Sequence, residues 1–292
     1  MVFAVDVEYV AARRALLDAL FALEKHPSPI VLIGAQAVYL RTGTAEFDIS
    51  VDPSTTDADL ALNPAVLGAD PQLEDVMAAA GFARTTCQPG AWLTNIRLAD
   101  GISRTVEVDL MVPEALAGPG SRAARLPDQA KHVARRGRGL EAAMIDNNPM
   151  VITSYEESDV RVVEVAVAGT AALLIAKAHK LYERIKAETV ERRPTDRVRP
   201  KDAGDVFRLA VQAEPPDIIG GRLRKLAQDD MAAEAVVDGI GYLEELFARR
   251  RTRGVGLAIK ALSTGGGVPA ERIEVLLPNY INELLAAFRS TA

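Results

Sequence analysis

The spacing of apolar residues predicts a mixed α/β arrangement in the first half of the chain. Residues 7–25 carry apolar side chains at helical spacing, and the prolines that follow end the helix. The wholly apolar run PIVLIGA at 29–35 is typical of a buried strand. We further expect a helix from 35–40, a strand at 47–62, a helix at 64–80 ending at Gly81, strands at 91–98, 103–112 and 163–169, and a helix at 170–186.

After residue 215 the pattern becomes helical throughout. Apolar positions recur at helical spacing near 216–228, 230–250, 255–263 and 270–289, without the alternation that marks a strand. We therefore expect an α+β protein. A small mixed sheet flanked by helices should occupy residues 1–168, and an all-helical lobe residues 169–292.

Composition narrows the class of protein. The chain has 292 residues, 49% of them hydrophobic, which is ample for one large or two medium domains. Its single cysteine, Cys87, allows no internal disulfide, and its three histidines lie far apart without zinc-ligand spacing. The sequence shows no signal peptide and no apolar run of membrane-spanning length, so we expect a soluble cytoplasmic protein that does not bind membranes.

The stretch STTDADLAL at 54–62 carries two aspartates at strand spacing. Asp57 and Asp59 point to one face because strand side chains alternate, while Ala58 and the leucines point to the other. A bound divalent cation would offset the repulsion between two such carboxylates. The alternative is an ordinary polar turn, since Asp and Thr are common turn residues.

A third carboxylate, Asp109, stands in the strand predicted at 103–112. Its neighbours alternate in the same way, with valines and a leucine on the opposite face. If this strand pairs with the strand that carries Asp57 and Asp59, the three carboxylates could converge on one metal ion or a pair of ions, as phosphoryl-transfer enzymes require. The alternative for Asp109 is a polar residue on a solvated sheet face.

Three further features could belong to a site for a phosphate-bearing substrate. Gly34 and Ala35 stand at a strand-to-helix turn, where small residues let backbone amides approach a phosphate. The helix expected at 170–186 presents Lys177, Lys180 and Arg184 on one face. Asp202 and Asp205 share a face near the start of the next helix. Each feature also has a plain structural interpretation: a tight turn, a solvated basic face, and acidic residues that complement a helix dipole.

Taken in order, these residues resemble the AbiEii/AbiGii-type nucleotidyltransferases, toxins of bacterial toxin–antitoxin pairs that include the MenT-type toxins. The resemblance runs from about residue 29 to residue 210, and it implies a DNA polymerase β-like nucleotidyltransferase core with a helical C-terminal lobe. Ala35 departs from the family, which usually has Ser or Gly there. The resemblance implies that Asp57, Asp59 and Asp109 bind the metal and that these three, with Lys177 and Asp202, are the catalytic residues. It implies that the nucleotide is contacted by Gly34, Ala35, Lys180 and Arg184. Further candidates of the same type are Asp205, Asp48 and Asp52.

The function that this resemblance implies is Mg²⁺-dependent transfer of a nucleoside monophosphate from an NTP to an RNA hydroxyl. The acceptor would be a tRNA 3′ end, and the partner an antitoxin protein. With a net charge of −6, RNA binding would need local basic patches, for which residues 121–139 and 248–253 are candidates. Two alternatives stay open: transfer to a small molecule such as an aminoglycoside, and a nucleotidyltransferase-like scaffold that only binds a partner.

Overall fold

The computed structural model describes residues 6–26, 30–43, 55–191, 197–263 and 267–290. The chain divides into two compact units. The sheet unit consists of Met1–Ala37, Asp52–Gly137 and Asn147–Ala168, and the helical unit of Val38–Val51, Arg138–Asp146 and Gly169–Ala292. Two short internal segments therefore group with the helices that follow Ala168.

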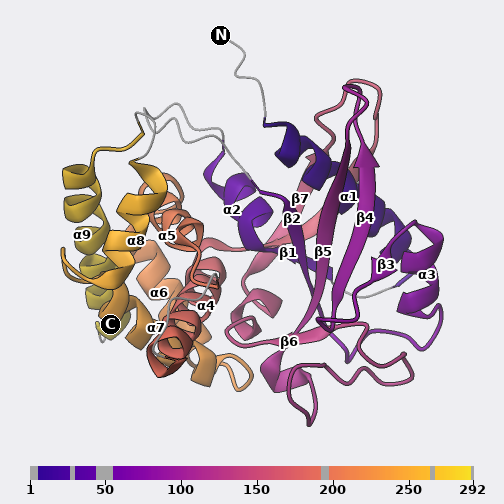
Figure 1. Ribbon diagram of the computed structural model, residues 1–292. Coiled ribbons are helices and arrows are strands. Elements are labelled where there is room, and N and C mark those ends of the chain that lie inside the picture. Colours follow the sequence, from indigo (N-terminus) through magenta and orange to yellow (C-terminus); the bar gives the residue numbers. More distant parts are fainter. Residues whose placement is uncertain (1–5, 27–29, 44–54, 192–196, 264–266, 291–292) are drawn as a thin grey trace. The chain divides into compact units, whose positions relative to one another are not determined.

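The sheet unit is built on one mixed sheet (Figure 1). Its described strands run in the order β3-β4-β5-β2-β1-β8-β7, with β6 paired to β5 outside this path. The pairs β2–β5, β5–β6 and β1–β8 are parallel and the others antiparallel, as expected for an α+β fold. The bounds are β1 Ile30–Ile33, β2 Asp57–Leu62, β3 Ala83–Arg84, β4 Ala91–Arg97, β5 Ser103–Pro113, β6 Arg135–Gly137, β7 Asn147–Thr153 and β8 Val162–Ala168.

Helix α1 (Val7–Leu23) packs against β2, β4 and β5 and buries one face of each. The Asp6 side chain begins the helix by accepting the backbone N–H of Glu8 at 3.0 Å. The core beneath it includes Trp92 of β4, whose indole N–H donates to the carbonyl of Val133 at 3.0 Å. This bond satisfies the one polar group of a large buried side chain.

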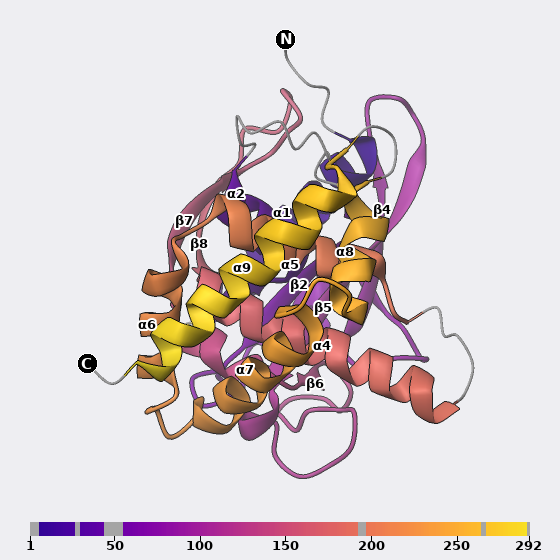
Figure 2. The ribbon, with the colours of Figure 1, turned by 90° about the vertical axis from the view of Figure 1, so that its left-hand side faces the viewer.

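The helical unit contains the six helices expected after residue 169, and no strand is found in its described residues. Helix α9 packs against α5, α6, α7 and α8 (Figure 2). The bounds are α4 Thr170–Glu191, α5 Pro200–Gln212, α6 Pro216–Leu226, α7 Ala233–Phe247, α8 Arg253–Leu262 and α9 Ala270–Arg289. Helix α2, Gly34–Thr42, starts in the sheet unit and ends in the helical unit.

The prediction of a helix at 64–80 is wrong for the first half of that range. Only α3, Leu73–Ala79, is helical, because Gly68 and Pro71 interrupt the chain before it. Strands β3, β6 and β7 were not anticipated. The first two are very short, and β7 is an edge strand that contains Pro149. Residues 44–54, including the reserve aspartates Asp48 and Asp52, lie outside the described residues.

Across the parts of the chain that the structure describes, no helix is both long enough and apolar enough to cross a membrane.

Candidate active site

Strand β2 holds the first two carboxylates in the middle of the sheet. It lies between β1 and β5, and Asp59 is paired with Ile33, the last residue of β1. Asp59 is 9% exposed and Asp57 is half-buried. The Thr55 hydroxyl donates to Asp57 Oδ1. Both carboxylates therefore lie on one face of β2, next to the point where β1 ends.

Gly34 turns the chain from β1 into α2, with a φ of +72°. A Cβ atom at this position would lie 2.0 Å from Asp59 Oδ2. The Asp59 carboxylate therefore lies directly against the glycine α-carbon, in space that any other residue would fill. The turn expected to approach a phosphate and one of the carboxylates expected to bind a metal thus meet at a single point. Ala35 follows, and its methyl group is buried.

Strand β5 lies beside β2 in parallel register, with Asp109 paired to Asp59. Paired residues on neighbouring strands point to the same face, so the structure brings all three aspartates to one side of the sheet. Asp109 is 5% exposed. Burial raises the pKa of its carboxyl, Glu107 and Asp57 raise it further, and Arg135 opposes this rise without cancelling it.

The partner of Asp109 is Arg135, which was expected only as part of the basic segment 121–139. It comes from β6, which pairs with β5 two residues beyond Asp109. Its guanidinium donates to both Asp109 oxygens, from Nη2 to Oδ2 at 2.6 Å and from Nε to Oδ1 at 3.3 Å. Such a two-point ion pair fixes the orientation of the carboxylate. Arg135 was expected, with the segment 121–139, to contact RNA phosphates; its charge is paired with Asp109, and the RNA contact stays a prediction.

A second segment also reaches Asp109. The Gln88 amide donates to Asp109 Oδ1 at 3.5 Å, and the backbone N–H of Gly90 donates to the carbonyl of His132 at 3.0 Å. A Cβ at Gly90 would meet the Arg135 backbone nitrogen at 2.5 Å, so only glycine permits this close packing. The loop before β4 and the segment before β6 therefore hold one carboxylate together.

The acidic residues fit a hard cation only in part. Among the described residues, no three His, Cys, Asp or Glu side chains are arranged to hold a metal ion, so the expected centre of three carboxylates is not assembled. Arg135 donates one hydrogen bond to each Asp109 oxygen, so its guanidinium already compensates the charge of this carboxylate, and the role of Asp109 as a third ligand stays a prediction. Asp57 and Asp59 do fit Mg²⁺, which commonly takes one or two carboxylates and completes its shell with substrate phosphates and water.

The helical unit holds a separate charged cluster between α4 and α5, which we call the Lys177 cluster: Lys177, Lys180, Arg184, Asp202 and Asp205. Lys177 Nζ donates to Asp202 Oδ1 at 2.8 Å and to Asp205 Oδ2 at 2.6 Å. Arg184 and Lys180 reach Asp202 at 2.9 Å and 3.2 Å. The expected residues are thus together, but all three cations are paired with the acids of the same cluster.

Exposure separates the members of this cluster. The side chain of Lys177 is 5% exposed, whereas those of Lys180 and Arg184 are 35% and 27% exposed. Burial alone would lower the pKa of Lys177, but Asp202 and Asp205 outweigh it and raise the pKa above its ordinary value. Burial alone would raise the pKa of Asp202, and the three cations hold it well below its ordinary value. The expected role of Lys177 and Arg184 at the phosphates stays a prediction, and Lys180 is the more accessible cation.

The basic segments differ in how freely their charges face solvent. Arg136 donates to the carbonyl of Gly118 and lies 3.7 Å from Glu114, and half-exposed Arg138 lies 4.0 Å from Glu183. Arg249, Arg250 and Arg251, between α7 and α8, are exposed, and their side chains make no hydrogen bond or ion pair with any described residue. The first segment also has exposed charges, on Arg122, Arg125 and Lys131, whereas in the second the three consecutive arginines form one exposed run suited to phosphate contact.

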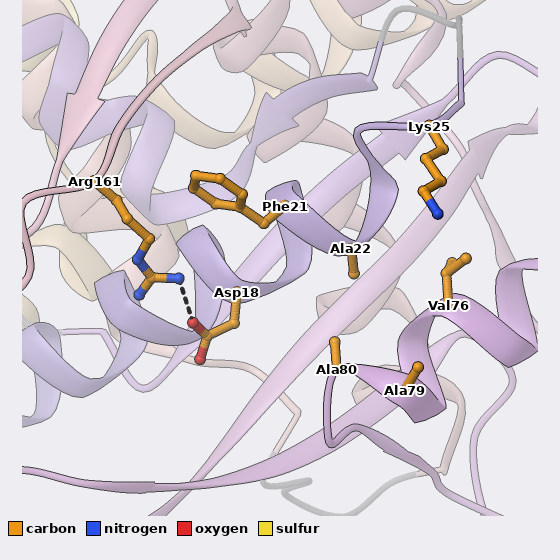
Figure 3. A pocket seen from close by; sticks show the side chains of 8 residues that line it. All are labelled: Asp18, Phe21, Ala22, Lys25, Val76, Ala79, Ala80 and Arg161. Atoms are coloured by element: carbon orange, nitrogen blue, oxygen red, sulfur yellow. Dashed lines mark hydrogen bonds and ion pairs between the residues drawn. The ribbon is translucent and has the colours of Figure 1, made fainter.

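Two hollows open on the sheet unit. One lies between α1 and α3, where Phe21, Ala22, Val76 and Ala79 form an apolar wall and Arg161 is tied to Asp18 at 2.6 Å (Figure 3). None of the site residues expected from the sequence lines it. The other, of about 460 Å³, is lined by Glu74, Arg84, Thr85, Thr86, Pro89 and His132. Of these six residues only His132 lies in a segment, 121–139, for which a role was expected from the sequence.

No protein-family model and no curated protein matches the chain. Among solved structures, the chain is similar to the crystal structure of an antigenic nucleotidyltransferase-like protein from Paracoccidioides brasiliensis. The TM-score is 0.43 and the sequence identity 14%, over 86% of this chain and 93% of that one. A similarity of this size assigns the chain to no family.

Replacing Gly34 by alanine should destabilise the protein more than the same change at Gly81. Both glycines have positive φ, +72° and +85°, so both variants lose about 1–2 kcal/mol from backbone strain. Only Gly34→Ala also drives a methyl group into Asp59, which should add about 1–3 kcal/mol, since nothing lies within 4 Å of a Cβ at Gly81. Urea unfolding measures the difference. Equal losses would mean that Asp59 does not lie against the turn.

Removing the Lys177 charge should cost far more stability than removing that of Lys180. Lys177→Met leaves two buried carboxylates facing each other, at a cost of about 3–5 kcal/mol, whereas Lys180→Met removes a partly exposed ion pair worth under about 1 kcal/mol. Adding Asp205→Asn to Lys177→Met should recover part of the loss. Similar unfolding free energies for the two single variants would contradict the buried ion pairs.

Proposed function

We propose that this protein is a Mg²⁺-dependent nucleotidyltransferase that moves a nucleoside monophosphate from an NTP to an acceptor hydroxyl. The observation that supports it most directly is the contact between Gly34 and Asp59. The turn at Gly34 stands at the N-terminus of α2, where backbone amides could meet phosphate oxygens, and a carboxylate that could hold a metal ion lies against it. Such a turn and carboxylate together suit a triphosphate that carries its own cation.

The reaction we propose is an in-line displacement. The acceptor oxygen attacks the α-phosphorus, the bond from that phosphorus to the bridging oxygen breaks, and pyrophosphate leaves with the bond electrons. Asp57 and Asp59 would hold Mg²⁺, which neutralises charge on the phosphates when bound. Asp109 would lie beside the attacking hydroxyl and accept its proton. Its raised pKa suits a general base, and Arg135 fixes its direction.

We further propose RNA, and specifically a tRNA 3′ end, as the acceptor, with growth inhibition as the biological effect and an antitoxin protein as partner. The resemblance drawn from the ordered residues supports this. So does the exposed run Arg249, Arg250 and Arg251, because unpaired arginines on an otherwise acidic protein suit phosphate contact.

A scaffold that binds nucleotides without transferring them is the second candidate. Two expected catalytic groups, Asp109 and Lys177, are engaged in ion pairs with Arg135 and with Asp202 and Asp205. In an active enzyme at least Asp109 must still reach the acceptor. Mg²⁺-dependent NTP binding with no transfer to any acceptor would favour the scaffold.

Replacing either β2 aspartate should abolish transfer. Asp57→Asn and Asp59→Asn keep the side-chain size but remove the charge that holds the cation. The assay is incubation with each NTP labelled at its α-phosphate, Mg²⁺ and total RNA or small hydroxyl compounds, followed by separation of the products. Label should appear in the RNA with the wild type and fall at least about 100-fold with each variant, in line with the loss of one stabilising group.

The matched control is Asp75→Asn, an exposed aspartate on α3 outside the site, which should leave transfer unchanged. Full transfer by Asp57→Asn or Asp59→Asn would contradict the metal site. Label in an aminoglycoside rather than in RNA would keep the nucleotidyltransferase and overturn the RNA acceptor.

Neutralising the arginines between α7 and α8 should weaken RNA binding and its salt dependence. In the Arg249→Gln, Arg250→Gln, Arg251→Gln triple variant, the slope of log affinity against log salt should fall by roughly 0.7 per lost phosphate contact. A salt titration of RNA binding measures this. Arg136→Gln is the control, since its charge is already taken by Glu114 and Gly118. Unchanged slope and affinity in the triple variant would remove this segment from the RNA contact.

A further inference from the structure

The hollow lined by Glu74, Arg84, Thr85, Thr86, Pro89 and His132 belongs to the sheet unit, and we call it the His132 pocket. Its volume of about 460 Å³ falls in the range of small-molecule sites. None of the residues expected to bind metal or phosphate lines it, and only His132 belongs to a segment, 121–139, expected to contact RNA. It therefore needs an explanation of its own.

Two of the segments that line the pocket also hold Asp109, whereas Arg84, paired with Trp92, lies on the other face of the sheet. Thr85, Thr86 and Pro89 belong to the loop that also carries Gln88, whose amide donates to Asp109 Oδ1 at 3.5 Å. His132 lies three residues before Arg135, whose guanidinium binds both Asp109 oxygens. The Gly90 N–H bond to the His132 carbonyl joins the two segments. The same two segments thus form the pocket and hold the carboxylate placed beside the attacking hydroxyl.

The charged groups of the pocket are already paired. Arg84 lies 3.0 Å from Glu74 and donates to the carbonyl of Lys131 at 2.7 Å. An anionic ligand would have to displace one of these partners, so the pocket suits a neutral polar group better than a further phosphate.

Two polar side chains stay available in the pocket. The Thr86 hydroxyl and the His132 imidazole are exposed, and neither makes a hydrogen bond or ion pair with any residue that the structure describes. A hydroxyl both donates and accepts hydrogen bonds, and a neutral imidazole does so through its two nitrogens. A ribose 2′-hydroxyl, which is also both donor and acceptor, matches this pair.

We infer that the His132 pocket binds the ribose of a nucleotide at the active site through Thr86 and His132. This inference rests on the proposed function for the identity of the ligand. The ribose could come from the terminal nucleotide of an RNA acceptor or from the incoming NTP, since both carry the same vicinal hydroxyls. Recognition of the 2′-hydroxyl would let the protein distinguish ribonucleotides from deoxyribonucleotides.

The test compares substrates that differ by one hydroxyl. Transfer is measured with RNA whose terminal nucleotide is ribose or 2′-deoxyribose, and separately with an NTP or its 2′-deoxy form. One lost hydrogen bond should raise KM roughly 3- to 10-fold in the wild type for the source that occupies the pocket. Thr86→Val and His132→Ala should raise KM for the ribose form by a similar factor and leave the deoxy form unchanged. Cys87→Ser, an exposed neighbour outside the pocket lining, should keep the discrimination.

A binding measurement separates failure of the pocket from failure of the proposed function. The chain has three histidines, so the His132 ring signal in a proton NMR spectrum can be assigned with the His132→Gln variant. Adenosine should shift this signal at lower concentration than 2′-deoxyadenosine, and Thr86→Val should remove the difference. If no acceptor is labelled but this difference holds, the proposed function fails and the pocket stands. Equal shifts by both nucleosides, or unchanged 2′-hydroxyl discrimination in Thr86→Val, would overturn the pocket.

Discussion

The lack of a side chain at Gly34 is the constraint on which the candidate site depends. A Cβ at Gly34 would collide with the Asp59 carboxylate. Because Gly34 has no Cβ, Ile33 at the end of β1 can pair with Asp59 of β2 and the chain can turn into α2 at the next residue. The positive φ of Gly34 makes that turn possible, and the missing Cβ leaves room for the acid. A backbone turn and a carboxylate are thereby brought into contact at the end of a buried strand.

The protein handles carboxylate charge in two ways, one in each unit. The Arg135 guanidinium donates hydrogen bonds to both oxygens of Asp109, whereas Asp202 forms ion pairs with Lys177, Lys180 and Arg184. The first pair orients an acid within the sheet, whereas the second ties α4 to α5 inside the helical unit. A buried lysine with two buried carboxylates specifies how two helices pack, and this accounts for the conjunction of Lys177 and Asp202 without any ligand.

Features that depend on local periodicity could be read from the sequence. The alternation around Asp109 predicted β5, and the helical spacing after residue 215 predicted α6 to α9. The strand pairing of β2 with β5, on which the placement of Asp57, Asp59 and Asp109 on one face depended, is present, although the three do not form a metal-binding group among the described residues.

Contacts between distant segments could not be predicted in this way. Arg135 lies on a strand of three residues, too short to show alternation, so its pairing with Asp109 had no signal. The partner of Lys177 depends on how α4 packs on α5, which spacing within one helix does not reveal. Gly34 was singled out as a small residue at a turn, but the carboxylate that requires it is found only from the fold.

The most direct test of this account is Mn²⁺ binding measured by the loss of its free electron paramagnetic resonance signal, with Mn²⁺ replacing Mg²⁺. The protein is titrated with and without an NTP analogue whose α,β-bridge cannot be cleaved. Since the metal is expected to be shared between the β2 carboxylates and the phosphates, the wild type should bind Mn²⁺ more tightly with the analogue, and Asp59→Asn should lose this gain. The same nucleotide-dependent binding in Asp59→Asn as in the wild type would contradict the account.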